Sequence, residues 1–391
     1  MNTDPLLDLE ANVRFYLSDK LRKPLAKPHW VFISVSHKCN FNCQMCGVKN
    51  VLQEHDLEAG VIKDVLGEVA GWGTDQTVLF TGGEPFLRKD IFDLISYGAS
   101  LGVNMEVVTN GSLIDTSDMA KKIVSSGLRN IAISLDGAYS QTHDKIRGVA
   151  GGFQKALDAL KLLYFAKADA GLGPQISVWT TIMKGNLSEL YDMISLTRPL
   201  GVECLVYHPV IVIQEDMQNT VAQGSLWLND DDVVALKQQI DKISEYQKQN
   251  GFVAFLHDPY LWLDYFRRTL TKEQWQCNPF VFVDIGPDGE VRSCGPTFGN
   301  VKEFGLTGCL NTPQADKARE RMSGCVKPCL QTCWARPEAD SLMKLVRDFV
   351  FRADSLPVTN DAKRKILSDG IRLLESFEKI VVEKGVYGRP A

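Results

Sequence analysis

Eight of the ten cysteines fall into two groups, and this clustering is the clearest sign of chemistry in the chain. The first group is Cys39, Cys43 and Cys46, with spacing C-x3-C-x2-C in the run CNFNCQMC. The second group is Cys277, Cys294, Cys325, Cys329 and Cys333. The N-terminal residues carry no secretory signal, so we expect a cytoplasmic protein with reduced thiols. Clustered thiols in that compartment indicate a metal site.

The first group suits an iron–sulfur cluster with one open iron. A cubane of four irons takes four ligands, and this run lacks the fourth cysteine of ferredoxin-type runs. An open coordination position indicates chemistry, by the same logic that separates catalytic from structural zinc sites. The alternatives are a zinc site and scattered buried thiols. Zinc ligands favour a C-x2-C pair with a second pair nearby, which this loop lacks.

The elements around these cysteines alternate between strand and helix patterns. Six apolar runs rich in β-branched residues predict strands at 30–36, 77–82, 104–110, 131–137, 175–182 and 202–209. Stretches of helical period, such as residues 90–102 and 151–168, separate them. This alternation predicts an α/β fold with a parallel sheet, a partial (β/α)6 TIM-like barrel. The first cysteine group then follows the first strand, on the side where barrel enzymes place their active sites.

In this position the motif resembles the signature of the radical S-adenosylmethionine (SAM) superfamily. The resemblance implies a 4Fe–4S cluster on Cys39, Cys43 and Cys46, whose open iron chelates the amino and carboxylate groups of SAM. It also implies reductive cleavage of SAM to a 5'-deoxyadenosyl radical, which takes a hydrogen atom from a substrate. Such an oxidoreductase needs an electron donor such as flavodoxin or ferredoxin.

Short motifs at the later strand ends resemble SAM-binding positions of the same family. They are Gly82, Gly83 and Glu84 in GGEP, Asn110 in TNG, Ser134 and Asp136 in SLDG, and Arg147 in HDKIRG. In the family the first motif receives the SAM amino group, the next two lie near its methionyl and ribose groups, and the arginine pairs with its carboxylate. Each match alone also fits a turn or a solvated charge, so their repetition at successive strand ends carries the argument.

Other polar residues receive no catalytic assignment. Thr180 and Asn186 stay open as fifth-strand contacts. A core role is favoured for Tyr207 and His208, and the alternative is that they face adenine or the substrate. His143 is interpreted as a helix-start residue. No general acid or base can be named, because such roles depend on geometry.

The second cysteine group surrounds a predicted hairpin. Cys277, Gly289 and Cys294 fit C-x11-G-x4-C around Pro-Asp-Gly, a hairpin signal, and CVKPCLQTC follows at 325–333. This resembles the SPASM extension, or its shortened twitch form. Full SPASM uses seven cysteines for two clusters, so five favour one auxiliary 4Fe–4S cluster. Cys325 ranks slightly below the other four, and tetrahedral zinc is the alternative.

These patterns divide the chain into five parts. They are an N-terminal arm at 1–29, the barrel at 30–212, a helical connector at 213–270, a small cysteine-rich hairpin and helix domain at 271–337, and C-terminal helices at 338–391. The connector helix is expected to begin at Asn229 or Asp230 and to end at Gly251. Net charge −5 without a long single-sign run disfavours nucleic acid as a partner. No stretch approaches the roughly 18 to 20 apolar residues of a membrane span.

The expected substrate is a small polar metabolite, modified by dehydrogenation, epimerisation or rearrangement. A peptide or protein is the first alternative, because many SPASM enzymes modify one, although the 29 residues before the barrel are few for a leader-binding module. A non-catalytic iron–sulfur electron carrier or redox sensor is the alternative from another class.

Overall fold

The computed structural model of the chain describes residues 9–10, 13–16, 18, 23–48, 56–73, 76–211, 226–255, 258–271, 274, 279–323, 330, 349–350, 353 and 358–383. Four of the predicted ligands, Cys277, Cys325, Cys329 and Cys333, lie outside these residues. The first cysteine group and Cys294 lie within them.

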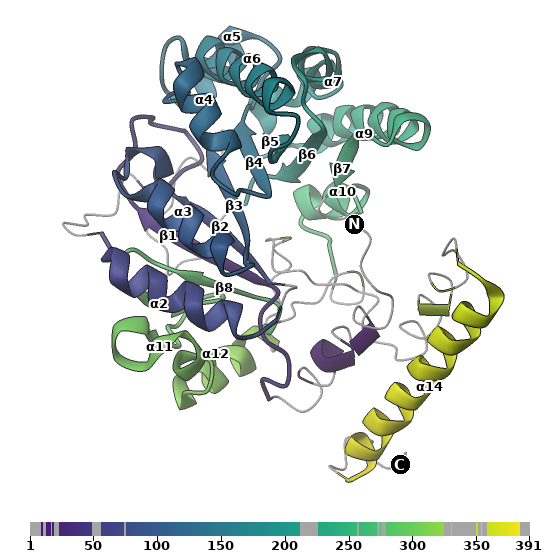
Figure 1. The fold of residues 1–391 in the computed structure, drawn as a ribbon. Coiled ribbons are helices and arrows are strands. Elements are labelled where there is room, and N and C mark those ends of the chain that lie inside the picture. The colour runs from purple at the N-terminus through teal and green to yellow at the C-terminus, as the bar shows by residue number, and fades with distance from the viewer. Residues whose placement is uncertain are drawn as a thin grey trace.

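A ten-stranded sheet forms the body of the molecule (Figure 1). Its parallel strands are β1 (Trp30–Ser36), β2 (Thr77–Gly82), β3 (Asn104–Thr109), β4 (Asn130–Ser134), β5 (Gln175–Ile182), β6 (Cys204–Pro209), β7 (Val253–Phe255) and β8 (Phe282–Ile285). The antiparallel strands β9 (Glu290–Arg292) and β10 (Gly299–Asn300) follow β8 at one edge. The order is β10-β9-β8-β1-β2-β3-β4-β5-β6-β7. Among the described residues the pairing does not close into a ring, which confirms the predicted α/β class and partial barrel.

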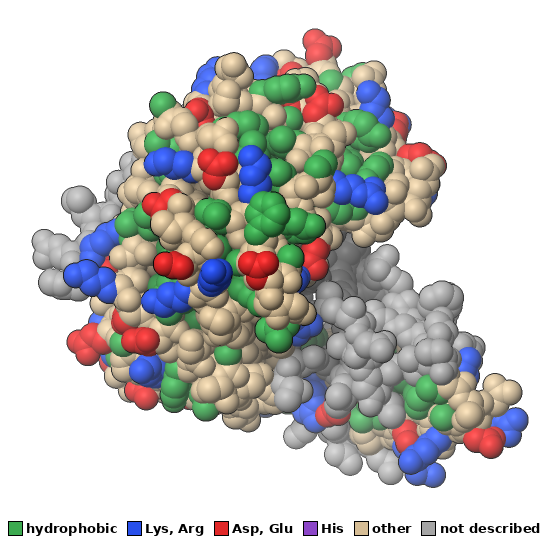
Figure 2. All heavy atoms as spheres, turned by 45° about the horizontal axis from the view of Figure 1, so that its top comes forward, with side chains coloured by type: hydrophobic (Ala, Val, Ile, Leu, Met, Phe, Trp, Pro, Cys, Tyr) green, Lys and Arg blue, Asp and Glu red, His purple; other side chains and the backbone are tan. Residues whose placement is uncertain are grey.

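Helices connect the parallel strands. They are α2 (Ala59–Ala70), α3 (Ile91–Ser100), α4 (Ser117–Val124), α5 (Ser140–Arg147), α6 (Gly152–Ala170), α7 (Asp192–Thr197), α9 (Asp230–Asn250) and α10 (Leu261–Arg267). Short 3-10 turns lie at Pro85–Leu87, Lys184–Glu189 and Arg198–Leu200. The C-terminal part contributes α11 (Val301–Cys309), α12 (Pro313–Ser323) and α14 (Asn360–Glu383). On the face seen in Figure 2, basic and acidic side chains are interspersed over the helices.

Burial alternates along the strands because the two faces of the sheet have different neighbours. On β1, Val31, Ile33 and Val35 are fully buried and belong to the hydrophobic core, whereas Trp30 and Phe32 are only half-buried. Successive side chains of a strand point to opposite faces, so the half-buried residues share the other face. Trp30 and Phe32 line a cavity on that face of the sheet.

All six strands predicted between residues 30 and 209 are present. The largest difference is at β4, which ends at Ser134 because the chain turns there: the N–H of Asp136 donates to His143 Nδ1 and the sheet ladder stops. β7 was not predicted, since its three residues are too short to show alternation. The connector helix α9 begins after Asn229, whose side chain accepts from the N–H of Asp232 at 2.9 Å, and it ends at Gly251, as predicted.

The hairpin assigned to the cysteine-rich appendage extends the sheet of the barrel. Its first strand, β8, pairs with β1 in parallel. The segment after it is fastened to α2 by the carboxylate of Glu68, which accepts from the N–H groups of Leu306 at 2.8 Å and Thr307 at 2.7 Å. Trp72 Nε1 also donates to Thr307 Oγ1 at 3.1 Å. Chain segments more than 200 positions apart are thereby joined.

In the described part of the chain, no helix has both the length and the apolar character needed to cross a membrane.

Candidate active site

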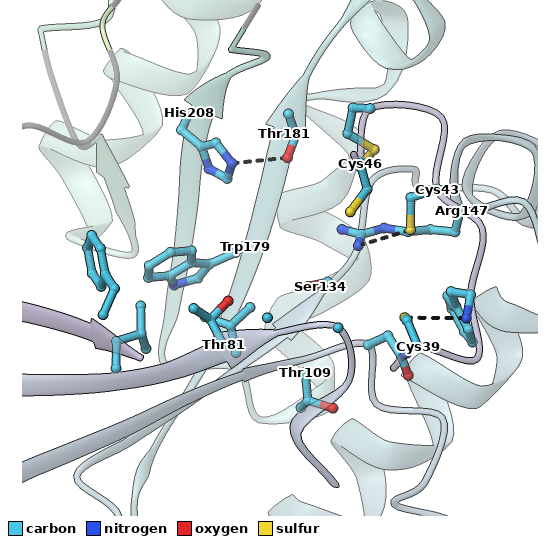
Figure 3. A pocket seen from close by; sticks show the side chains of 18 of the residues that line it. Cys39, Cys43, Cys46, Thr81, Thr109, Ser134, Arg147, Trp179, Thr181 and His208 are labelled. Carbon is cyan, nitrogen blue, oxygen red and sulfur yellow. Dashed lines mark hydrogen bonds between the residues drawn. The ribbon is translucent and has the colours of Figure 1, made fainter. Parts of the chain in front are cut away.

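Cys39, Cys43 and Cys46 all line one cavity of about 500 Å³ on the hollow side of the sheet. The loop after β1 forms one wall, residues on β1 to β6 and β8 or at the ends of these strands form most of the rest, and Arg147 of α5 completes it. Trp179 and His208 lie across the cavity from Cys43 (Figure 3). The structure therefore places the first cysteine group where the barrel topology predicts it.

The first half of the cysteine loop is held by the GGE motif after β2. The N–H of Gly83 donates to the Ser36 carbonyl at 2.7 Å, and that of Glu84 donates to the Lys38 carbonyl at 2.8 Å. A Cβ on Gly82 would lie 2.3 Å from the Ser36 oxygen, and one on Gly83 would lie 2.1 Å from the Lys38 oxygen. Both positions require glycine because the two loops touch backbone to backbone.

The second half of the loop is held by the C-terminal end of α5. The N–H of Asn42 donates to the Arg147 carbonyl at 3.2 Å, and that of Gln44 donates to the Ile146 carbonyl at 2.8 Å. A helix leaves its last carbonyls unpaired, so the loop supplies their partners. Gly148 ends the helix at φ 66°, and a Cβ there would lie 2.2 Å from the Asn42 oxygen. The HDKIRG motif thus positions the cysteines through its backbone.

Glu84 braces the ends of two strands. Its buried carboxylate accepts hydrogen bonds from Thr109 Oγ1 at 2.7 Å, from the N–H of Asn110 at 2.8 Å and from the N–H of Phe86 at 3.1 Å. Burial raises the pKa of Glu84, and these hydrogen bonds oppose the rise. Among the described residues, the wall of the cavity includes the two glycines of the motif but not Glu84.

Asn110 and Ser134 lie on the cavity wall. Asn110 Nδ2 donates to Asn40 Oδ1 at 2.9 Å, and Asn40 Nδ2 donates to Ser112 Oγ at 2.8 Å. The N–H of Ser112 in turn donates to Asn110 Oδ1 at 2.9 Å. This ring of three residues, closed by the backbone N–H of Ser112, ties the cysteine loop to the end of β3.

Asp136 and Arg147 form an ion pair beside the middle cysteine. Arg147 Nε lies 2.7 Å from Asp136 Oδ2, and Asp136 is fully buried. Arg147 Nη1 also donates to Cys43 Sγ at 3.8 Å (Figure 3). Burial raises the pKa of Asp136, and the charge of Arg147 opposes the rise. The pair therefore keeps a guanidinium group at the sulfur atom of Cys43, and only Arg147 of the two reaches the cavity wall.

Three polar residues that received no catalytic assignment from the sequence, His143, Thr180 and Asn186, bind backbone groups. His143 Nδ1 accepts from the N–H of Asp136 at 3.2 Å, and burial together with Arg147 lowers its pKa to about 3, so the ring is neutral. Thr180 Oγ1 donates to the Leu135 carbonyl at 2.8 Å. Asn186 Nδ2 donates to the Asp136 carbonyl at 2.8 Å. These side chains fix the turn after β4.

Tyr207 and His208, for which a core role was favoured, differ from each other. Tyr207 is buried and donates to the Leu190 carbonyl, as its predicted core role requires. His208 lies on the cavity wall, with Nε2 3.0 Å from Thr181 Oγ1 and its ring 6.1 Å from that of Trp179. Its place there follows from strand register, because it pairs with Thr181, which also lines the cavity.

The cysteine loop fits an iron–sulfur cluster. Burial raises the pKa of Cys39 and of Cys43, so their protons must leave when a metal binds. Within the described ranges, no three His, Cys, Asp or Glu side chains converge on a point that suits a single metal ion. A cubane takes each cysteine on a different iron, so its ligands need not converge in that way. Three thiols on one short loop, all of which line the same cavity, are the donor set that a cubane with one open iron takes.

Sequence reasoning missed Asp284, which lines the cavity from β8. Burial raises its pKa to about 6, and the nearby charge of Arg292 opposes the rise. The alternation in VFVDI indicated a strand, but only the pairing of β8 with β1 brings this carboxylate to the site. In the second cysteine group, Cys294 is half-buried after β9, and its predicted co-ligands lie outside the described residues.

Comparison with known families agrees with this geometry. Residues 33–185 match the Radical SAM superfamily. The chain carries a radical SAM domain. The match begins on β1 and ends after β5, so it contains the cysteine loop, the glycine pair and the Asp136–Arg147 pair.

Curated relatives align with about half of the chain. The chain is 30% identical over 188 residues to the AdoMet-dependent heme synthase of Methanosarcina barkeri, covering 48% of this chain and 51% of that protein. It is 29% identical over 180 residues to the PqqA peptide cyclase of Rhodopseudomonas palustris, covering 46% of each chain. The chain thus spans about half the length of these relatives.

A solved structure shows the same fold. Native anSMEcpe with bound AdoMet superposes with a TM-score of 0.59, covering 88% of this chain and 100% of that chain at 15% identity.

Gly148→Ala is expected to loosen the cysteine loop, because the new Cβ would collide with the Asn42 carbonyl. Gly171→Ala is the matched control: Gly171 ends α6 at φ 68° with nothing within 4 Å of its Cβ position. The free energy of unfolding of the control should fall only by the cost of a left-handed backbone at a residue with a Cβ, about 1–2 kcal/mol. The measurements are urea unfolding and iron content after anaerobic reconstitution. Equal iron content in the two variants would contradict the role given to Gly148.

Proposed function

We propose that the chain is a radical SAM enzyme that cleaves SAM reductively and takes a hydrogen atom from a bound substrate. The observation that carries the proposal is the cavity shared by Cys39, Cys43 and Cys46 with the glycine pair after β2 and with Arg147. When bound, a 4Fe–4S cluster with one open iron supplies the electron that cleaves SAM to methionine and a 5'-deoxyadenosyl radical.

The residues of the chain hold and orient the reactants. The three cysteines would ligate the cluster, and the glycine pair permits a close approach of the backbone to the SAM amino group. Asn110 and Ser134 offer polar groups to the SAM methionyl and ribose groups from the wall. Asp136 holds Arg147 in place, and the guanidinium favours a negative charge at Cys43 and at the SAM carboxylate.

Apolar side chains line much of the cavity and would keep water from a radical. Trp30, Phe32, Leu79 and Trp179 lie on the wall. A reactive carbon radical must meet its substrate before any other hydrogen donor, and a closed apolar site favours that outcome. This is a reason to prefer an enzyme over an electron carrier, which has no need of such a cavity.

The second cysteine group is proposed to hold an auxiliary 4Fe–4S cluster that relays an electron or anchors the substrate. Cys294 follows β9, and the sheet and the Glu68 contacts fasten its segment to the barrel. Cys277, Cys325, Cys329 and Cys333 supply enough further thiolates for one cluster. Zinc is the alternative metal.

The proposed substrate is a small metabolite, with a peptide as second candidate. The cavity of about 500 Å³ would also hold SAM and the cluster, so the space that remains for a substrate favours a small molecule. The peptide candidate is favoured by the similarity to a peptide cyclase. The proposed electron donor is flavodoxin or ferredoxin, in the cytoplasm.

Cys43→Ala is expected to abolish reductive formation of 5'-deoxyadenosine from SAM, because the cluster loses one of three ligands. The product is quantified by chromatography after anaerobic reconstitution and reduction with dithionite. Cys204→Ala is the control, since Cys204 is half-buried on β6 and does not line the cavity. A fully reconstituted wild type that forms no 5'-deoxyadenosine would refute the enzyme and leave the electron carrier.

The Cys39→Ala, Cys43→Ala, Cys46→Ala triple variant tests the second group. It should retain about four irons and four sulfides per chain, which the auxiliary cluster alone would hold. Iron and sulfide are measured after anaerobic reconstitution, beside the wild type. Iron near zero in the triple variant would make the second group a zinc or structural site instead.

A further inference from the structure

Asp284 gives the cavity a carboxylate on the strand beside β1. The pairing of β8 with β1 sets Asp284 opposite Phe32, and the pairing of β1 with β2 sets Phe32 opposite Leu79. Residues opposite one another on neighbouring strands point to the same face of a sheet. All three line the cavity, so they form one row of its wall. Of the described residues on that wall, Asp284 is the one carboxylate.

This carboxylate makes no hydrogen bond or ion pair with any residue that the structure describes. Arg292 lies opposite Asp284 in the register of β8 and β9, and its charge lowers the pKa of Asp284, whereas the charge of Asp288 in the hairpin turn raises it. Arg292 is itself turned toward Asp288, with Nη2 3.8 Å from Oδ2. The raised pKa of Asp284, about 6, reflects the cost of a carboxylate in this place. Such a cost is typical of residues that bind or react.

The surroundings of Asp284 are apolar and aromatic. Trp30 and Phe32 pack together with ring centroids 6.0 Å apart, and Trp179 lies on the same cavity wall. Apart from the cysteines, the other ionisable side chains described on the wall are Arg147, paired with Asp136, and His208, bound to Thr181. The wall therefore offers apolar contact surface with a negative group beside it.

We propose that Asp284 binds the substrate through an ammonium, guanidinium or N–H donor group carried on an apolar or aromatic body. The inference rests on the proposed function, since it takes this cavity as the substrate site. Burial removes hydrogen bonds between the Asp284 carboxylate and water, and a cation beside it replaces them with a charged hydrogen bond. A substrate with an anionic group at this place meets like charge in a site of low dielectric and is rejected. Asp284 is therefore a residue that determines specificity.

The test uses two probes with the same aromatic body and opposite charge, tryptamine and indole-3-propionate. Their binding to the reconstituted enzyme with SAM is measured by anaerobic equilibrium dialysis. Wild type should bind tryptamine about tenfold more tightly than indole-3-propionate, as expected for a charged hydrogen bond. Asp284→Asn, which keeps the shape and removes the charge, should abolish most of that difference.

Asp288→Asn is the matched control, because Asp288 lies on the same hairpin with an exposed side chain and loses the same charge. It should keep the tenfold preference, and equal loss in both variants would overturn the proposal. Wild type without a preference also overturns it, whether or not Asp284→Asn folds. Formation of 5'-deoxyadenosine by that wild type separates the two claims: if SAM is cleaved, the proposed function stands and only the role of Asp284 fails.

Discussion

Backbone hydrogen bonds that hold the cysteine loop between two neighbouring elements are the constraint on which the site depends. The glycine motif after β2 holds one half of the loop, and the end of α5 holds the other. These contacts leave no room for a Cβ at Gly82, Gly83 or Gly148. Three cysteines on a short loop can be ligands only if the loop has one shape. The glycines therefore serve the metal site even though they contribute no donor atom to it.

Electrostatics give the site its second constraint. The buried Asp136 is tolerated because Arg147 lies beside it, and removing one partner of such a pair leaves an uncompensated charge that costs several kcal/mol. The guanidinium so held also reaches Cys43. Hydrogen bonds to cysteine sulfur and nearby charge are among the factors that set cluster potentials. Asp284 forms no such ion pair within the described part of the chain, although Arg292 lies opposite it on β9, and we propose that its charge is available to a substrate.

The sequence was sufficient for the features that depend on local pattern. Alternation predicted the six barrel strands, and the C-x3-C-x2-C motif predicted the loop that enters the cavity. It could not show that Glu84 turns away to brace β3, or that β8 joins β1 and brings Asp284 to the wall, because these depend on contacts between distant segments. For the same reason a core role was favoured for His208, which lies on the cavity wall. The ligation of Cys277, Cys325, Cys329 and Cys333 stays a prediction.

The measurement that tests the central claim most directly is the electron paramagnetic resonance spectrum of the reduced cluster with and without SAM. It is recorded on the wild type and on the Cys277→Ala, Cys294→Ala, Cys325→Ala, Cys329→Ala, Cys333→Ala variant, in which only the first group remains. If Cys39, Cys43 and Cys46 hold a cubane with an open iron, SAM binds that iron and the signal changes shape in both proteins. A signal that SAM leaves unchanged in both would contradict a SAM-binding cluster at this loop.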